Sequence, residues 1–515
     1  MTSTPRSATG HSVPTWVYLT ALAAVTLVSR LPQLLSPNLL LEGDECILGL
    51  MAMHLAGGHE FPVFFYGQKY GLSIVEAPAA ALNFVIFGVG ALPLKLAMLG
   101  IWIVGILFYF LAFSSVLGAT RSFWITLVLI LMPAWAASSM KALSGYITAF
   151  SATAVAFYLI TRNDNLRSTP WLFAGGVSAI IYFSQPLWLP GLLPIVLFFL
   201  FSSRRLSFWF FYLSGIVGVI LAITLIKASW LAGAVESWTA PGAGNPHLLG
   251  SFPRLLNQTY VNLTGSYSVG FAVHPGPVTA IVAYLWLAML AVVVLLQIYR
   301  LVTRKYLLWS HLLFASVLLT LLANWVLLDR RDARYMLALN VPLVFMTGVE
   351  LFDLADRYRL STRRCVSAIV LVLALEAVSM NEFAQLTYMW WTNPSSGPSE
   401  ARTMEKVIDN MRARGVTRAF AMNPLLQWQI TFYSRESVIV RWKDNIDRYP
   451  AYISEVDRAL EHGETVAVVG YVRYTGGLER MVPDPRSIID VDGKYFVYIG
   501  AEKELLRKAG FRFSK

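Results

Sequence analysis

A polar stretch between two apolar segments holds side chains that could do chemistry. Residues 41–78 read LEGDECILGLMAMHLAGGHEFPVFFYGQKYGLSIVEAP. They include two adjacent acids, Asp44 and Glu45, and a lysine, Lys69, inside a tyrosine-bounded run at 66–70. A carboxylate can accept a proton from a hydroxyl nucleophile or hold a metal ion, and a lysine can pair with phosphate. Because polar side chains are costly in lipid, this cluster is expected to face water or a substrate.

The rest of the chain is dominated by apolar segments. Of its 515 residues, 56% are hydrophobic and only 14% are charged, and the mean hydropathy is +0.57. Segments close to the ~20 residues that cross the hydrocarbon recur between residues 15 and 382. The sequence therefore predicts a polytopic α-helical membrane protein. Its net charge of +11 fits membrane topology and not nucleic-acid binding, because the basic residues gather in short loops between apolar spans.

About eleven membrane-spanning segments are predicted. They are 15–35, 94–118, 122–138, 147–161, 170–184, 187–202, 207–229, 275–299, 307–328, 335–354 and 365–382. The apolar segment 72–90 is left out, because its crossing would place the basic clusters of four later loops on the outside, against the positive-inside rule. We expect it to lie along the interface or to re-enter and line a cavity. The residues before 15 are predicted to form a cytoplasmic tail.

This topology places three polar regions on one outer face: the first loop at 36–93, the loop 230–274 and the chain from 383 onward. In the last of these, helical patterns at 399–414 and 448–462 alternate with strand-like runs at 417–422, 437–441, 465–471 and 495–499. We therefore expect two domains: a membrane domain over 1–382 and an extracytoplasmic α/β domain over 383–515.

One cluster of basic residues does not follow the positive-inside rule. Residues 329–335 read DRRDARY and fall outside, between two predicted spans. They can be a charged loop that is balanced by its own aspartates. Alternatively, Arg331 and Arg334 can bind an anion, because a guanidinium matches phosphate in fork geometry.

Together these features resemble the GT-C superfamily of membrane glycosyltransferases, and most closely the protein O-mannosyltransferases, the aminoarabinose transferases and related bacterial proteins of glycosyltransferase family 39 type. The residues that carry the resemblance are Gly43-Asp44-Glu45, Phe61-Pro62, Tyr66 to Gly71, Glu76 and Arg334-Tyr335.

The resemblance implies an inverting transferase that moves a hexose or pentose from a polyprenyl-phosphate donor. The acceptor would be a protein, a lipid or a glycan, and the active site would lie on the extracytoplasmic face of the plasma or inner membrane.

The acids of the first loop are the predicted catalytic residues. We expect Asp44 to be the base that deprotonates the acceptor, although it could instead cap a helix beginning near Cys46. Glu45 is expected to support it, to join a metal site or to complement the helix dipole. No cofactor is certain; a divalent metal is possible, with Asp44 as its ligand.

Two cations are the predicted phosphate clamp, Lys69 and Arg334, with Arg331 as a further candidate. Positive charge is needed there because negative charge develops on the departing lipid phosphate. Interfacial snorkelling of Lys69 and simple anchoring of a span end by Arg334 are the alternatives.

Further residues are predicted to contact the sugar or lipid. Those proposed to bind sugar hydroxyls are Tyr66, Gln68, Tyr70 and Glu76; the others are His54, Lys141, Tyr146 and Tyr335. The tyrosines could also form an interfacial belt, and the histidine could simply be exposed. The loop 138–146 carries a lysine and no carboxylate, whereas relatives often have an acid near the position of Thr148. A two-carboxylate metal site is therefore not expected from this loop.

Two rival classes stay open. A lipid-linked sugar transporter or polymerase of the cell envelope would have inverted repeats with broken spans, and no internal repeat is visible in this sequence. A non-catalytic membrane scaffold would leave Asp44 dispensable.

Overall fold

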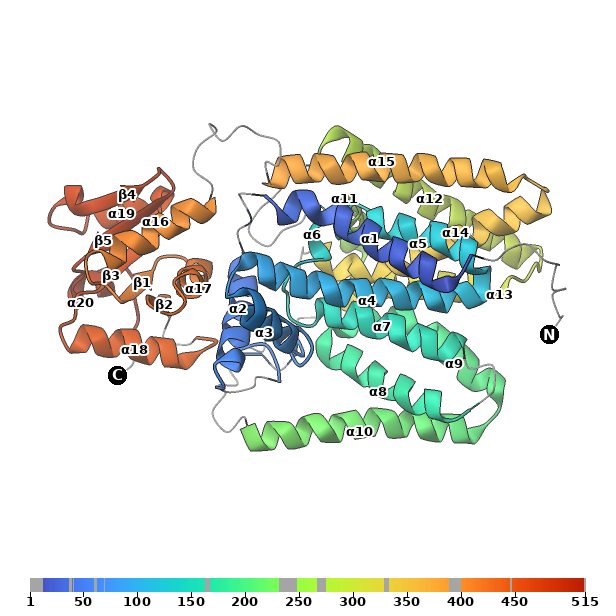
Figure 1. Cartoon of the computed structure of the whole chain (residues 1–515), viewed down its shortest axis with the longest axis horizontal. Coiled ribbons are helices and arrows are strands. Elements are labelled where there is room, and N and C mark those ends of the chain that lie inside the picture. The colour runs from blue at the N-terminus through green and yellow to red at the C-terminus, as the bar shows by residue number, and fades with distance from the viewer. Residues whose placement is uncertain are drawn as a thin grey trace.

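The computed structural model describes residues 13–36, 39, 41–59, 63–68, 70–162, 167–230, 248–265, 275–327, 333–388, 400–444 and 447–513. A bundle of apolar helices carries a small mixed α/β domain at one end (Figure 1). We call this end of the bundle the domain face. The last helix of the bundle continues to Tyr388, beyond the domain boundary at 382 that the sequence predicts.

The predicted fold class is confirmed. Eight stretches of helix are long and apolar enough to cross a membrane, and four shorter apolar helices accompany them in the described part of the chain. The helices of the bundle are α1 (Thr15–Leu34), α4 (Ala91–Leu117), α5 (Ala119–Leu131), α6 (Trp135–Ser138), α7 (Tyr146–Thr161), α8 (Thr169–Ser184), η1 (Pro186–Trp188), α9 (Leu189–Ser203), α10 (Leu206–Trp230), α12 (Pro277–Val302), α13 (Leu308–Leu327), η2 (Ala333–Met336), α14 (Leu337–Arg357) and α15 (Thr362–Tyr388). Each predicted span falls on a continuous helical stretch of this list, apart from 122–138, which is divided between α5 and α6 by residues 132–134.

The first loop contains two short helices, α2 (Gly43–Ala56) and α3 (Glu76–Phe87). The second occupies the apolar segment that we did not count as a span. Its 12 residues extend about 18 Å at 1.5 Å per residue, which is less than the ~30 Å of hydrocarbon. By length alone the helix falls short of a full crossing, as the 13-residue α5 also does, so its exclusion from the spans rests on the positive-inside rule.

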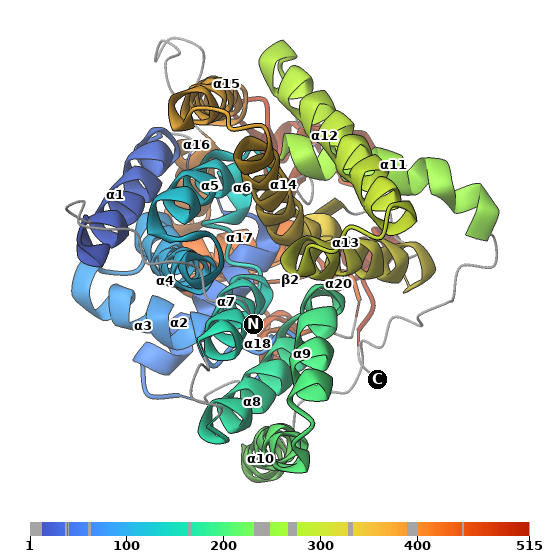
Figure 2. The same cartoon turned by 90° about the vertical axis from the view of Figure 1, so that its right-hand side faces the viewer.

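The bundle is built around buried central helices and lipid-facing peripheral ones. Figure 2 shows the bundle from the end opposite the C-terminal domain, with α10 at its edge beside α8. A Cβ atom on Gly175 would lie 1.9 Å from the carbonyl oxygen of Tyr212, and one on Gly215 would lie 2.0 Å from that of Leu172. Only glycine permits this approach, which is how small residues join helices where no hydrophobic effect drives them together.

The long loop between α10 and α12 differs from the expectation of an unbroken polar loop. It contains the helix α11 (Leu248–Thr264), whose buried Asn262 donates a hydrogen bond to Asn340 of α14 at 2.7 Å. The sequence there is amphipathic, and its apolar face packs on α12 and α13.

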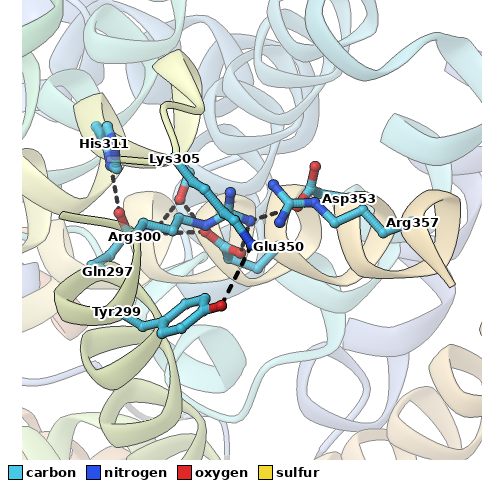
Figure 3. Close-up of polar contacts among 9 residues, drawn as sticks. Gln297, Tyr299, Arg300, Lys305, His311, Glu350, Asp353 and Arg357 are labelled. Carbon is cyan, nitrogen blue, oxygen red and sulfur yellow. Dashed lines mark hydrogen bonds and ion pairs between the residues drawn. The ribbon is translucent and has the colours of Figure 1, made fainter. Parts of the chain in front are cut away.

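A buried polar network joins three helices at the end away from the C-terminal domain (Figure 3). Arg300 of α12 donates to Glu350 of α14 at 2.7 Å and to Asp353 at 2.5 Å. The Gln297 amide nitrogen donates to Glu350 at 2.7 Å, and its amide oxygen accepts a hydrogen bond from Nδ1 of His311 of α13 at 2.6 Å. Buried charges persist only when they are paired and hydrogen-bonded, so this network fixes the relative positions of α12, α13 and α14.

The C-terminal domain is an α/β unit, as predicted. Its five-stranded sheet has the order β2-β1-β3-β5-β4, with β1 parallel to β2 and β3 and the remaining pairs antiparallel. Its elements are α16 (Glu400–Arg412), β1 (Arg418–Ala421), α17 (Pro424–Tyr433), β2 (Ile439–Arg441), α18 (Pro450–Glu461), β3 (Ala467–Tyr471), η4 (Val472–Tyr474), α19 (Thr475–Glu479), η5 (Pro485–Ser487), β4 (Ile488–Val491), β5 (Tyr495–Ile499) and α20 (Lys503–Lys508). The strand β4 and the helix α17 were not predicted.

Helix α17 attaches this domain to the membrane part by packing along α2. A Cβ atom on Gly49 would lie 2.4 Å from the Phe432 ring, so the two helices approach closely. Tyr433 accepts a hydrogen bond from the backbone N–H of Leu41 at 2.9 Å, and Gln429 donates to the Leu41 carbonyl at 2.8 Å. The domain is thus fixed to the helix that carries the predicted catalytic acids.

Candidate active site

The N-terminus of α2 orients three acids differently. The residue that caps this helix is Glu42, and it forms a reciprocal capping box with Glu45. The alternative that Asp44 caps the helix is therefore wrong, since Asp44 lies inside the first turn. Consecutive helical residues point in directions about 100° apart, so the two glutamates can face the protein interior while Asp44 faces elsewhere.

Each of the two glutamates is paired with a lysine inside the protein. Glu45 is 2% exposed and forms an ion pair with Lys95 of α4. Glu42 accepts a hydrogen bond from Lys141 at 2.8 Å. Burial alone would raise the pKa of Glu45, but the charges of Lys95 and Lys141 outweigh it and lower that pKa. The two pairs together hold α2 against α4 and against the segment before α7.

Asp44 is left partly open. Its side chain is 18% exposed and lies 3.6 Å from the guanidinium of Arg448, which belongs to the C-terminal domain. Glu42 and Glu45, by contrast, are buried. Among the three acids at the start of α2, Asp44 is the one that a substrate could reach.

The loop 63–72 folds beside Asp44. It is closed by a bridge between Phe64 and Leu72 and needs left-handed backbone at Gly67 and Gly71. A Cβ atom on Gly67 would lie 2.8 Å from the Cα of Arg448. On its other side, the Gly71 carbonyl accepts a hydrogen bond from Ser144 at 2.7 Å. The loop therefore bridges the C-terminal domain and the start of α7.

Glu76 supplies the carboxylate that the loop 138–146 lacks. It accepts hydrogen bonds from the backbone N–H of Gly145 and of Thr148 at 3.0 Å, and from the Thr148 hydroxyl at 3.0 Å. Burial raises the pKa of Glu76 to about 7, and these hydrogen bonds oppose the rise. Sequence reasoning saw no acid near Thr148, because this one comes from α3.

His54 connects the first loop to the C-terminal domain. The alternative that it is exposed is wrong, since only 7% of it is accessible. Its Nδ1 lies 2.6 Å from the Tyr66 hydroxyl and its Nε2 lies 2.8 Å from Glu436, which also accepts a hydrogen bond from Tyr452 at 2.6 Å. Burial would raise the pKa of Glu436, but these two hydrogen bonds lower it overall. The Tyr449 ring packs on His54 and Tyr66.

A second group of predicted residues gathers around Arg334. Its guanidinium carbon lies 5.8 Å from the ring centre of Tyr146 and 5.3 Å from that of Tyr335. Tyr146 directly follows Gly145, so this group adjoins the loop that Glu76 and Ser144 hold. The structure thus brings these three residues together and links them to the Asp44 region through residues 63–72.

The remaining predicted residues fall into three sets. Glu45, Glu76 and Lys141 already have partners inside the protein, so substrate contacts by them would require an exchange of partners. Tyr70 is 48% exposed and Gln68 is partly buried. Lys69 and Arg331 lie outside the described residues. Within the described ranges, no three His, Cys, Asp or Glu side chains are grouped to hold a metal, and a metal at Asp44 stays a prediction.

An apolar cavity of about 830 Å³ opens between α8, α9, α10 and α13. Its walls include Tyr182, Leu193 and Leu322, whose side chains are also exposed on the lipid-facing surface. Phe183 is one of its lining residues, and the Phe183 carbonyl accepts a hydrogen bond from the Gly71 N–H at 3.0 Å. The wall of the cavity and the loop 63–72 are therefore in contact.

The sequence-based prediction missed Arg448 and Glu436, two charged residues of the C-terminal domain that pair with side chains of the first loop. Arg448 lies in the turn that leads into α18, directly before Tyr449 and Pro450. Nothing in the sequence indicated that this turn lies on the loop at 63–72.

No protein-family model matches the chain, and no curated protein matches it at a significant level. Among solved structures, it is similar to ArnT from Cupriavidus metallidurans bound to undecaprenyl phosphate, with a TM-score of 0.58 and 11% identity over 96% of this chain and 99% of that chain. The oligosaccharyltransferase of Archaeoglobus fulgidus, in complex with Zn and sulfate, matches at a TM-score of 0.48 and 12% identity over 90% of this chain and 69% of that chain. The likeness to ArnT extends over nearly the whole length of both chains. The chain therefore shares its overall fold with ArnT.

Proposed function

We propose that the chain is an inverting glycosyltransferase that moves a sugar from a polyprenyl-phosphate donor to an acceptor on the domain face, which topology predicts to be extracytoplasmic. This proposal rests on the connection between an accessible carboxylate and an apolar cavity. A partly exposed carboxylate, Asp44, is linked through Arg448 to the loop 63–72, and Gly71 of this loop bonds to Phe183 in the wall of an apolar cavity. An amphiphilic donor needs this combination, since its isoprenoid chain requires an apolar surface and its sugar requires a polar one.

The proposed chemistry uses few groups. Asp44 takes the proton of the acceptor hydroxyl, whose oxygen attacks C1 of the sugar from the side opposite the phosphate. The C1–O bond to phosphate breaks, and polyprenyl phosphate leaves with the electron pair. Arg334, between its two tyrosines, balances the charge on the departing phosphate. ArnT, whose fold the chain shares, holds undecaprenyl phosphate in its solved structure, which supports this class of donor.

The test is an exchange of Asp44 for asparagine, which keeps the shape and removes the base. Membranes that contain the full chain are incubated with undecaprenyl-phosphate-linked mannose, glucose and arabinose together with the extracted glycans, lipids and proteins of the source cells. Release of undecaprenyl phosphate is measured by mass spectrometry. Asp44→Asn should lower the rate about 10²-fold or more, which is the usual contribution of a general base.

The matched control is Asp409→Asn, on the exposed side of α16, which should retain the wild-type rate. The same assay with and without EDTA tests the predicted metal. Full activity of Asp44→Asn would refute the assignment of the base. Absence of carrier release by the wild-type chain would instead favour a non-catalytic scaffold.

A further inference from the structure

Arg448 lies in a turn of the C-terminal domain that is fixed from two sides. The carboxylate of Asp447 accepts a hydrogen bond from the Arg448 N–H at 2.6 Å and from Gln427 of α17 at 3.0 Å. Burial raises the pKa of Asp447 to about 6, against the effect of these hydrogen bonds. Because α17 packs along α2, the turn is held at a set distance from the start of α2.

The Arg448 side chain extends from this turn into the membrane domain. Its guanidinium carbon lies 5.2 Å from the ring centre of Phe65, and one of its nitrogens lies 3.6 Å from an Asp44 oxygen. The backbone contact with Gly67 fixes the Cα end of the residue. Both the backbone and the guanidinium of Arg448 are therefore held in place. The guanidinium lies near Asp44, between α2 and the loop 63–72.

The neighbouring acids have cations of their own. Glu42 and Glu45 are paired with Lys141 and Lys95, both from the membrane domain. Asp44 differs from them because its ion pair is with Arg448, a residue of the other domain. This pair is also partly open, with 22% of the Arg448 side chain exposed, so an acceptor could enter beside it.

We propose that Arg448 is a positioning residue for Asp44, and that the C-terminal domain thereby completes the active site of the membrane domain. The inference rests on the proposed function. An ion pair restricts the carboxylate to one orientation, with one oxygen toward the guanidinium and the other free to accept the acceptor proton. Without it, the carboxylate rotates away from the reactive geometry. Through this ion pair, the C-terminal domain would contribute to the chemical step as well as to the stability of the membrane domain.

The experiment compares Arg448→Ala with wild type, using the undecaprenyl-phosphate-linked sugar that the wild-type chain turns over in membranes. We expect kcat to fall about 10- to 100-fold, as for other misplaced catalytic groups, while KM for the donor and the thermal midpoint stay close to wild type. Arg448→Lys should recover part of the rate, because an ammonium keeps the charge without the fork. Low concentrations of guanidinium ion should partly rescue Arg448→Ala and not wild type.

The matched control is Arg435→Ala. Arg435 also crosses between the domains, where it donates to the Val89 carbonyl at 3.3 Å. Its replacement should leave kcat unchanged. The same fall in both variants would show that loosened docking, and not the loss of the guanidinium at Asp44, slows the reaction, and would overturn the inference.

A double variant separates this inference from the proposed function. If Arg448 acts through Asp44, then Arg448→Ala has no further effect in the Asp44→Asn background. A full additional loss of rate in the double variant would overturn the positioning role. An unchanged kcat in Arg448→Ala alone would overturn it as well. Either result leaves the glycosyltransferase proposal standing. Full activity of Asp44→Asn would overturn the base assignment, and the positioning role with it.

Discussion

Replacement of Lys95 by methionine tests whether Glu45 acts in catalysis or in folding. Methionine has nearly the length of lysine but no charge, so the variant leaves the Glu45 carboxylate buried without its principal cation. The double variant Lys95→Met/Glu45→Gln removes both charges and keeps one amide oxygen, which can accept one of the two hydrogen bonds that Glu45 receives from the N–H groups of Glu42 and Ala142, at 3.1 and 3.0 Å.

The expected magnitude follows from burial. Removal of one partner of a buried ion pair usually costs about 3–5 kcal/mol, whereas removal of both is often neutral. The remaining hydrogen bonds and the nearby charge of Lys141, which also lowers the pKa of Glu45, place the single variant near the lower end, at about 3 kcal/mol. The double variant should recover most of this loss.

The assay is unfolding of the purified full chain in mixed micelles by SDS titration, together with sugar transfer per folded molecule. A single variant as stable as wild type, or a double variant no more stable than the single one, would refute the reasoning from burial. A double variant that folds normally but transfers sugar about 10²-fold more slowly would instead support the catalytic role predicted for Glu45 from sequence.

Three further expectations concern other parts of the molecule. Arg334→Ala should lower transfer about 10²-fold by removing charge stabilisation of the leaving phosphate, and Arg334→Lys should lower it less; equal losses would count against a specific guanidinium contact. Gly215→Ala should destabilise the bundle by about 1–3 kcal/mol, because the added methyl would lie 2.0 Å from the Leu172 carbonyl, whereas Gly218→Ala on the same helix meets nothing within 4 Å and should be neutral; equal thermal midpoints would contradict the close approach. The pKa of Glu436 is below its ordinary 4.5 in the folded protein, so its ionised carboxylate stabilises the folded state above about pH 4.5 and this contribution is lost as the pH falls through the lowered value. Glu436→Gln should therefore remove about 1–3 kcal/mol near neutral pH and flatten the acid loss of thermal stability, which an unchanged pH profile would disprove.

Much of the membrane part was predictable because its signals are local. Runs of apolar residues of spanning length indicated the helices α1, α4, α5, α7 to α10 and α12 to α15, and the positive-inside rule left out 72–90, which forms the short helix α3. Short apolar runs likewise predicted four of the five strands in the C-terminal domain. The amphipathic helix α11 was missed because its mixed composition does not differ from that of a polar loop.

For the candidate site, the residue types were predictable from the sequence, and the accessibility of each acid was not. The amino-acid sequence by itself determined that acids, a histidine and tyrosines gather after the first span, since that depends only on residue types and spacing. It could not determine which acid stays accessible, because Glu42, Glu45 and Asp44 are near neighbours in the chain. What distinguishes them is that Glu45 and Glu42 are paired with lysines from α4 and from the segment before α7. Nor could it show that Glu76 occupies the space at Thr148.

The tertiary structure alone brought the C-terminal domain to this place. His54 and Glu436 are 382 residues apart in the chain, and Arg448 is further still from Asp44. No local pattern encodes such a contact, because it depends on how two separately folded surfaces fit, and here that fit follows from the glycine-lined approach of α17 to α2. Residue types therefore decide what chemistry is available, and packing decides which carboxylate can perform it.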